Sequence, residues 1–143
     1  MILQEVRLDG WDWNVFVFYD TDRHDSRYIL RLMRRLLCGR TVFRSASDNL
    51  RSGIWNTGLT YTNPRFHTTL MVVSRTTGGA QFWNTLDHEK GHVVSHISEY
   101  YGLSPEGEEI EYLRGELAGK LYPVAVRFLC EGCGRESAGS GFP

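Results

Sequence analysis

Long hydrophobic runs, an excess of charge of either sign and a regular set of cysteines are all missing from this sequence. No apolar stretch approaches the roughly 20 residues that a membrane-spanning helix needs, so we expect no membrane partner. The 16 basic and 17 acidic residues give a net charge of −1, which provides no overall attraction to nucleic acid or to an anionic membrane. The cysteines number three, and an odd count favours reduced thiols in a cytoplasm over a disulfide framework.

The sequence does contain enough apolar material for one hydrophobic core. Hydrophobic residues make up 41% of the 143 residues and aromatic residues 13%, which suits a single domain of ordinary size. Residues 1–5 lack the basic start and apolar stretch of a secretory leader, and we therefore expect a cytoplasmic protein. We expect the domain to span residues 1–133, followed by a flexible tail at 134–143, where the residues are mostly small or polar.

Four segments have the composition of strands or turns between strands. Residues 13–19 are β-branched and aromatic, which is typical of a buried strand. The runs at 58–61 and 66–74 are separated by an Asn-Pro turn and predict a hairpin. The segment from 41 to 52 is polar, and for it we expect a short strand at 41–44 followed by a loop.

Three segments repeat their apolar residues at helical spacing. They lie at residues 26–38, 80–101 and 106–121 or further. Gly39 and Gly102 follow the first two segments, in the position that glycine commonly takes after a helix. Pro123 is expected to end or kink the third helix, because proline lacks the backbone N–H that a helix interior uses.

Two clusters contain residue types that can bind cations. The polar loop after the first strand holds Asp20, Asp22, His24 and Asp25. Short polar side chains in such loops more often cap free backbone amides, and we expect capping here. Near the end of the chain, Cys130 and Cys133 form a lone Cys-x-x-Cys pair, which is a weak zinc motif without a second pair.

The helix at residues 26–38 has a basic face. Arg27, Arg31, Arg34 and Arg35 lie opposite its apolar residues. A row of arginines can bind phosphates, but arginines are also common on the solvated side of an amphipathic helix. No array of basic and aromatic residues accompanies them in the sequence, so we do not expect nucleic acid to be the main partner.

The strongest motif is His88-Glu89-Lys90-Gly91-His92. On a helix this spacing places His88 and His92 one turn apart on one face, with Glu89 beside them. Two neutral imidazoles directed at one point can bind zinc, and a neighbouring carboxylate can take a proton from the metal-bound water. The alternative is a solvated helix face whose histidines bind nothing, since a bare His-Glu-x-x-His pattern also occurs by chance.

A zinc site of this kind needs a third protein ligand. The last helix offers several glutamates, of which Glu109 lies at the edge of the predicted buried face, with Glu116 as the alternative. We choose Glu109 because it lies nearer the start of the helix. His96 is a rival one turn beyond His92, but three histidines on one straight helix diverge, and His96 fits better as a residue that lines the cleft or stabilises an oxyanion.

These motifs resemble those of a known class of enzyme. The residues from His88 to His92, followed by Glu108-Glu109-Ile110-Glu111-Tyr112-Leu113 on a second helix, resemble gluzincin-type zinc metallopeptidases. More narrowly, residues 82–89 and 107–117 resemble small metallopeptidase-like proteins carried by gut bacteria and their phages or mobile elements. The similarity covers about residues 58 to 121.

The resemblance implies a minimal zincin-like α+β fold, with a small mixed sheet, one flanking helix and two metal-bearing helices. It implies that His88, His92 and Glu109 hold Zn2+ and that Glu89 is the general base. Tyr112, His96 or His67 could donate a hydrogen bond to the oxyanion. An edge strand, either residues 58–61 or 66–74, could hold an extended peptide.

Two functional hypotheses follow from the sequence. The first is zinc-dependent hydrolysis of a peptide bond in a peptide or protein substrate, with Glu89 as the base. The second is a non-catalytic accessory protein of a mobile element, which would bind host protein or nucleic acid through the arginine face between Arg27 and Arg35. The sequence leaves the substrate, the cleavage specificity and the oligomeric state open.

Overall fold

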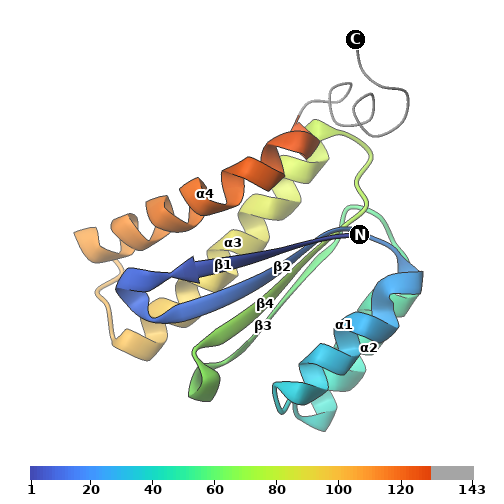
Figure 1. Cartoon of the computed structure of the whole chain (residues 1–143), viewed down its shortest axis with the longest axis horizontal. Coiled ribbons are helices and arrows are strands. Elements are labelled where there is room, and N and C mark those ends of the chain that lie inside the picture. Colours follow the sequence, from blue (N-terminus) through green and yellow to red (C-terminus); the bar gives the residue numbers. More distant parts are fainter. Residues whose placement is uncertain (130–143) are drawn as a thin grey trace.

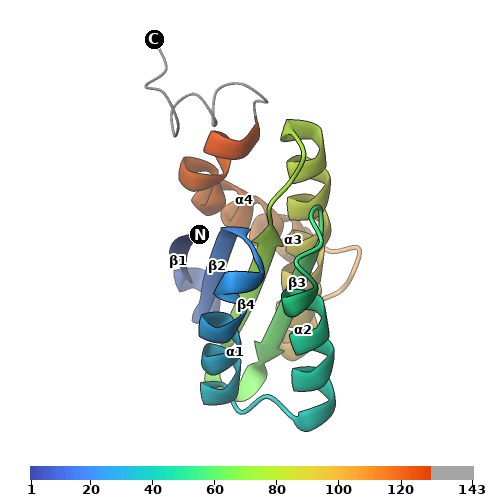
Figure 2. The same ribbon diagram turned by 90° about the vertical axis from the view of Figure 1, so that its right-hand side faces the viewer.

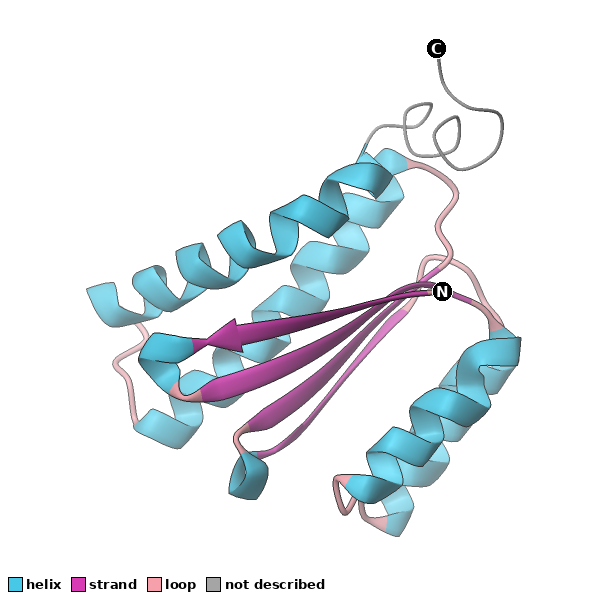
Figure 3. Ribbon diagram, viewed as in Figure 1, coloured by secondary structure: helices cyan, strands magenta, loops and turns pink. Residues whose placement is uncertain are grey.

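The computed structural model describes residues 1–129. In chain order the main elements are β1 (Ile2–Leu8), β2 (Trp13–Thr21), α1 (Ser26–Arg35), α2 (Arg40–Ser52), β3 (Gly58–Asn63), β4 (Thr68–Ser74), α3 (Gly79–Tyr101) and α4 (Glu108–Leu129). Figures 1 and 3 show a sheet between two layers of helices. The fold class is α+β with a mixed sheet, as the sequence predicts.

The four strands lie in the order β1-β2-β4-β3. The outer pairs are antiparallel hairpins, while the central pair, β2 and β4, is parallel. A parallel pair needs a long crossover between its strands, and here the crossover consists of α1, α2 and β3. The hairpin predicted from the Asn-Pro turn is confirmed, and β3 lies at one edge of the sheet.

Each face of the sheet has its own hydrophobic core. On one face, α3 and α4 pack against inward-facing residues of β1, β2 and β4, with Trp13, Val15 and Met71 among those fully or almost fully buried. On the other face, α1 and α2 cover Phe18, Leu70 and Val72. Figure 2 shows α1 and α2 side by side on the face opposite α3 and α4.

The prediction for residues 41–52 is wrong. They form the helix α2, not a short strand and a loop. Ala46 and Leu50 are buried and Phe43 is half-buried against the second core. These three residues recur at helical spacing, so burial of one narrow apolar stripe holds an otherwise polar segment in a helix. The flanking layer therefore contains two helices, where one was predicted.

The last helix does not end at Pro123, which was one of the two outcomes predicted for that proline. α4 continues through Pro123 to Leu129. The residues after Pro123 pack on the core, and the ring of Phe128 stacks on Tyr19 at 5.6 Å and on Phe82 at 5.0 Å between centroids. Burial of these residues offsets the loss of one helical hydrogen bond at proline. The strand β1 was not predicted at all.

None of the helices within residues 1–129 has both the length and the apolar character needed to cross a membrane.

Candidate metal and catalytic site

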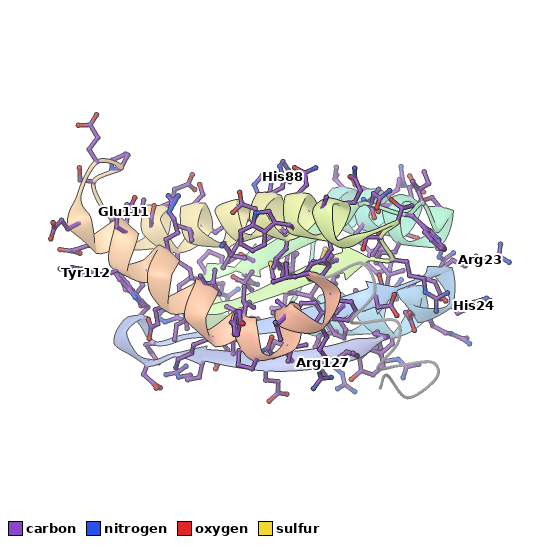
Figure 4. All side chains as sticks on the ribbon, turned by 90° about the horizontal axis from the view of Figure 1, so that it is seen from above. Arg23, His24, His88, Glu111, Tyr112 and Arg127 are labelled. Carbon is purple, nitrogen blue, oxygen red and sulfur yellow. The ribbon has the colours of Figure 1, made fainter. Side chains whose placement is uncertain are left out.

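The candidate site is built on α3. Its apolar residues Phe82, Leu86, Val93, Val94 and Ile97 are buried, as the sequence predicts. The side chains of His88 and His92 belong to a different, exposed face of the helix. Seen from above, His88 projects from α3 on the side turned away from α4 (Figure 4).

His88 and His92 direct their side chains at each other. Their Nε2 atoms are 3.2 Å apart and their ring centroids 4.8 Å apart. In a tetrahedral zinc site with bonds of about 2.1 Å, two ligand atoms are separated by roughly 3.4 Å. The spacing of this pair therefore fits two ligands of one metal ion.

Glu89 lies beside this pair but is turned under β3. Its side chain is only 5% exposed, and its Oε1 accepts a hydrogen bond of 2.8 Å from the Thr60 hydroxyl. Gly58 leaves the space that the carboxylate occupies, since a Cβ at position 58 would lie 2.5 Å from Cγ of Glu89. Any side chain at position 58 would therefore displace Glu89 from its place under the edge strand.

His96 is connected to the core by a chain of hydrogen bonds across the sheet. Trp13 Nε1 donates to Thr69 Oγ1 at 2.9 Å, Thr69 Oγ1 lies 2.8 Å from Thr62 Oγ1, and Thr62 Oγ1 lies 2.8 Å from His96 Nδ1. Because an indole N–H can only donate, each hydroxyl hydrogen finds an acceptor if the chain runs from Trp13 towards His96. In this direction Nδ1 accepts, and neutral His96 carries its proton on Nε2 as a donor.

His96 also lines a pocket of about 330 Å³. The other lining residues are Thr62, Pro64, Glu99 and Tyr100. Burial lowers the pKa of His96 below its ordinary value, the charge of His92 lowers it further, and Glu99 raises it. His96 is therefore held neutral, the form that the hydrogen-bond chain requires.

The depressed pKa of His96 predicts a pH dependence of stability. The folded protein favours neutral His96, and this preference adds to the free energy of unfolding. The added stability is complete above about pH 6.5, the ordinary pKa of histidine. We expect it to be lost as the pH falls from there through the lower folded pKa. Urea denaturation of chelator-treated protein between pH 7.5 and 5 should show a smaller loss for His96→Gln, and equal losses in the two proteins would contradict the assignment.

The expected convergence of a third ligand is not found. Among residues 1–129, no three His, Cys, Asp or Glu side chains gather in a way that could hold a metal ion. Glu109 is exposed on α4 and Glu116 is half-buried there. The reason is the packing of α4, whose Leu113 and Leu117 belong to the same core as the apolar face of α3, away from the histidine pair. Glu109 as a zinc ligand stays a prediction.

The other candidate oxyanion donors have different surroundings. Tyr112 is 68% exposed, and its hydroxyl donates to Glu108 Oε2 at 3.3 Å on α4 itself. His67 lies between the backbone oxygen of Asp12 and the hydroxyl of Tyr100, each 2.9 Å from a ring nitrogen. Its ring also stacks on Trp13. His67 therefore fastens the β3–β4 turn to the end of α3, and His96 is the one of the three that adjoins the pair.

Two clusters of possible cation ligands remain, the polar loop after β2 and the cysteine pair near the end of the chain. Asp22 accepts a hydrogen bond from the backbone N–H of His24 and forms a reciprocal capping box with Asp25, which confirms the capping prediction. Cys130 and Cys133 lie outside the described residues. Sequence reasoning missed Thr60 and Thr62, because only the register of β3 brings these ordinary strand residues to α3.

Comparisons with protein-family models, with curated proteins and with solved structures gave no match for this chain.

Proposed function

We propose that the protein is a zinc-dependent peptide hydrolase that uses His88 and His92 as metal ligands and Glu89 as general base. The observation that supports this proposal most is the 3.2 Å separation of the two Nε2 atoms. The two nitrogens lie within hydrogen-bond distance of each other, and the same spacing fits two ligands of one zinc ion.

The residues present fit two of the three protein ligands of a catalytic zinc ion. When bound, zinc would polarise a carbonyl oxygen and lower the pKa of its water towards 7. The third ligand is predicted to be Glu109, with Glu116 as the alternative. Either glutamate would have to approach the histidine pair from α4.

The proposal also gives roles to the other groups of the site. In this proposal Glu89 takes a proton from the attacking water and returns it to the leaving amine. Its side chain is 5% exposed and held by Thr60 through Oε1, so it would have to turn out from under β3 to do so. Neutral His96 donates from Nε2 towards a developing oxyanion. As the edge strand of the sheet, β3 can pair with an extended peptide through main-chain hydrogen bonds. β3, not β4, is the edge strand on this side, so residues 66–74 are excluded from that role.

Metal binding by the chelator-treated protein tests the proposal. We expect one zinc ion to bind, and His88→Ala or His92→Ala to weaken binding on the order of 100-fold, since each variant removes one of the few protein ligands that supply the binding free energy. Titration calorimetry would measure the affinity. His24→Ala is the matched control, because His24 is also exposed but lies in the loop before α1.

Two outcomes of this titration would count against the proposal. If the His88 and His92 variants bind zinc as well as the His24 control does, the histidine pair is not a metal site. If Glu109→Gln and Glu116→Gln both retain full affinity, neither glutamate is the third ligand, although the pair itself stands.

A further inference from the structure

The layer formed by α1 and α2 concentrates the positive charge of the molecule. Residues 22–53 contain eight arginines, no lysine and three aspartates, which gives this segment a net charge of +5. The rest of the chain holds eight basic and 14 acidic residues, a net charge of −6. The net charge of the whole sequence is therefore close to zero although the layer formed by α1 and α2 is strongly basic.

The arginines of this layer are exposed. Those on the two helices are Arg27, Arg31, Arg34, Arg35, Arg40, Arg44 and Arg51, and each is exposed. In the part of the chain from 1 to 129, no carboxylate lies within ion-pair distance of any of them. By contrast, Arg7, Arg75 and Arg114 elsewhere in the protein each have an acidic partner. The charge of the layer is thus available to a ligand.

A pocket of about 370 Å³ lies where α1 ends and α2 begins. Its lining residues are Arg34, Cys38, Arg40, Phe43, Arg44, Ser47 and Asp48. The guanidinium of Arg34 lies 4.4 Å from the centre of the Phe43 ring. Three arginines and one aromatic ring therefore share a concave site. The sequence did not predict this combination of arginines and an aromatic ring, because residues 41–52 were predicted to form a strand and a loop.

We propose that this basic layer binds single-stranded nucleic acid, with its phosphates on the arginines and one base in the pocket beside Phe43. Arginine forms bidentate hydrogen bonds with phosphate and stacks on planar rings, two properties that lysine does not combine. Proteins that bind single strands use a positively charged groove together with an aromatic side chain on which a base stacks. The layer lies on the opposite face of the sheet from α3, so the proposal does not depend on metal binding or hydrolysis.

The shape of the site favours a single strand over two other anionic partners. A duplex keeps its bases stacked inside, so the pocket beside Phe43 would stay empty. An anionic membrane surface would contact the exposed arginines but has no planar group to insert. Asp48 is the one acidic residue of the pocket, and its carboxylate repels phosphate, which makes it a useful position for a test.

Fluorescence anisotropy with labelled oligothymidylate and oligouridylate of equal length tests the proposal. We expect the triple variant Arg34→Gln, Arg40→Gln, Arg44→Gln to bind at least tenfold more weakly at low salt. The slope of log K against log salt should fall by about 2, since each phosphate contact contributes roughly 0.7 for single strands. Asp48→Asn should bind more tightly than the unmodified protein.

The matched control removes the same charge from other faces. The variant Arg65→Gln, Arg114→Gln, Arg127→Gln has the same net charge and should bind almost as well as the unmodified protein. Equal losses in the two triple variants would show a non-specific charge effect and overturn the proposal. Tighter binding to duplex DNA or to phosphatidylserine vesicles than to the oligonucleotides would overturn it as well.

Discussion

Replacing Glu89 by glutamine is expected to lower peptide cleavage by about 10²–10⁴-fold, the usual contribution of general acid–base catalysis. Glutamine has nearly the same shape and keeps an oxygen that accepts the Thr60 hydrogen bond. It also fits the space that Gly58 leaves. The fold and zinc affinity should therefore be retained while the proton acceptor is lost. Single-turnover assays on a peptide library, with zinc added after chelation, would measure the effect.

The control for this experiment is Glu111→Gln. Glu111 is an exposed glutamate on α4, where its Oε1 lies 3.9 Å from Arg114, and its loss should leave cleavage unchanged. If Glu89→Gln cleaves peptides as fast as the control, Glu89 is not the base. If the unmodified protein binds zinc but cleaves nothing in the library, the hydrolase part of the proposal fails and metal binding alone remains.

Replacing Trp13 by alanine is expected to cost about 3–5 kcal/mol of unfolding free energy, the range for deleting a fully buried large aromatic side chain. Trp13 is completely buried. Its ring stacks on His67 at 5.0 Å, and its Nε1 donates to Thr69. Since domains are stable by only about 5–15 kcal/mol, the variant should unfold at a much lower urea concentration than the unmodified protein.

Trp83 provides a matched control of the same residue type. It is 52% exposed on α3, where Lys90 Nζ lies 5.4 Å from its ring centre. Trp83→Ala should cost no more than about 1 kcal/mol, since the half-exposed ring buries little area and a cation–π contact near the surface contributes about 0.5–1 kcal/mol. Urea midpoints that differ little between the two variants would show that Trp13 does not anchor the core.

Helical periodicity predicted α3 and its two faces because burial alone decides which residues of a long helix point inward. The apolar face of Val93 and Ile97 and the histidine pair follow from the same spacing. α2 was not predicted because a stripe as narrow as Phe43, Ala46 and Leu50 is nearly lost among polar residues. β1 was missed because its residues alternate with charged ones at the start of the chain.

The spacing of residues in the sequence could not predict the parts of the site that depend on how separate helices and strands pack together. The position of Glu109 on a helical wheel does not say which face of α3 receives α4, and packing through Leu113 and Leu117 places that helix away from the histidines. The contacts of Thr60 with Glu89 and of Thr62 with His96 depend on the strand register of β3. Local sequence sets each element, whereas their mutual positions depend on contacts between distant residues.

The parallel pairing of β2 with β4 concentrates the entropic cost of folding at the centre of the sheet. Asn14 pairs with Thr68, 54 positions later, and closing such a loop costs about 1.5 kcal/mol more than closing a ten-residue loop. The two hairpins β1–β2 and β3–β4 close short loops. The hydrogen bond from Trp13 to Thr69 spans the central pair, so the chain of hydrogen bonds that reaches His96 is complete only when β2 and β4 have paired.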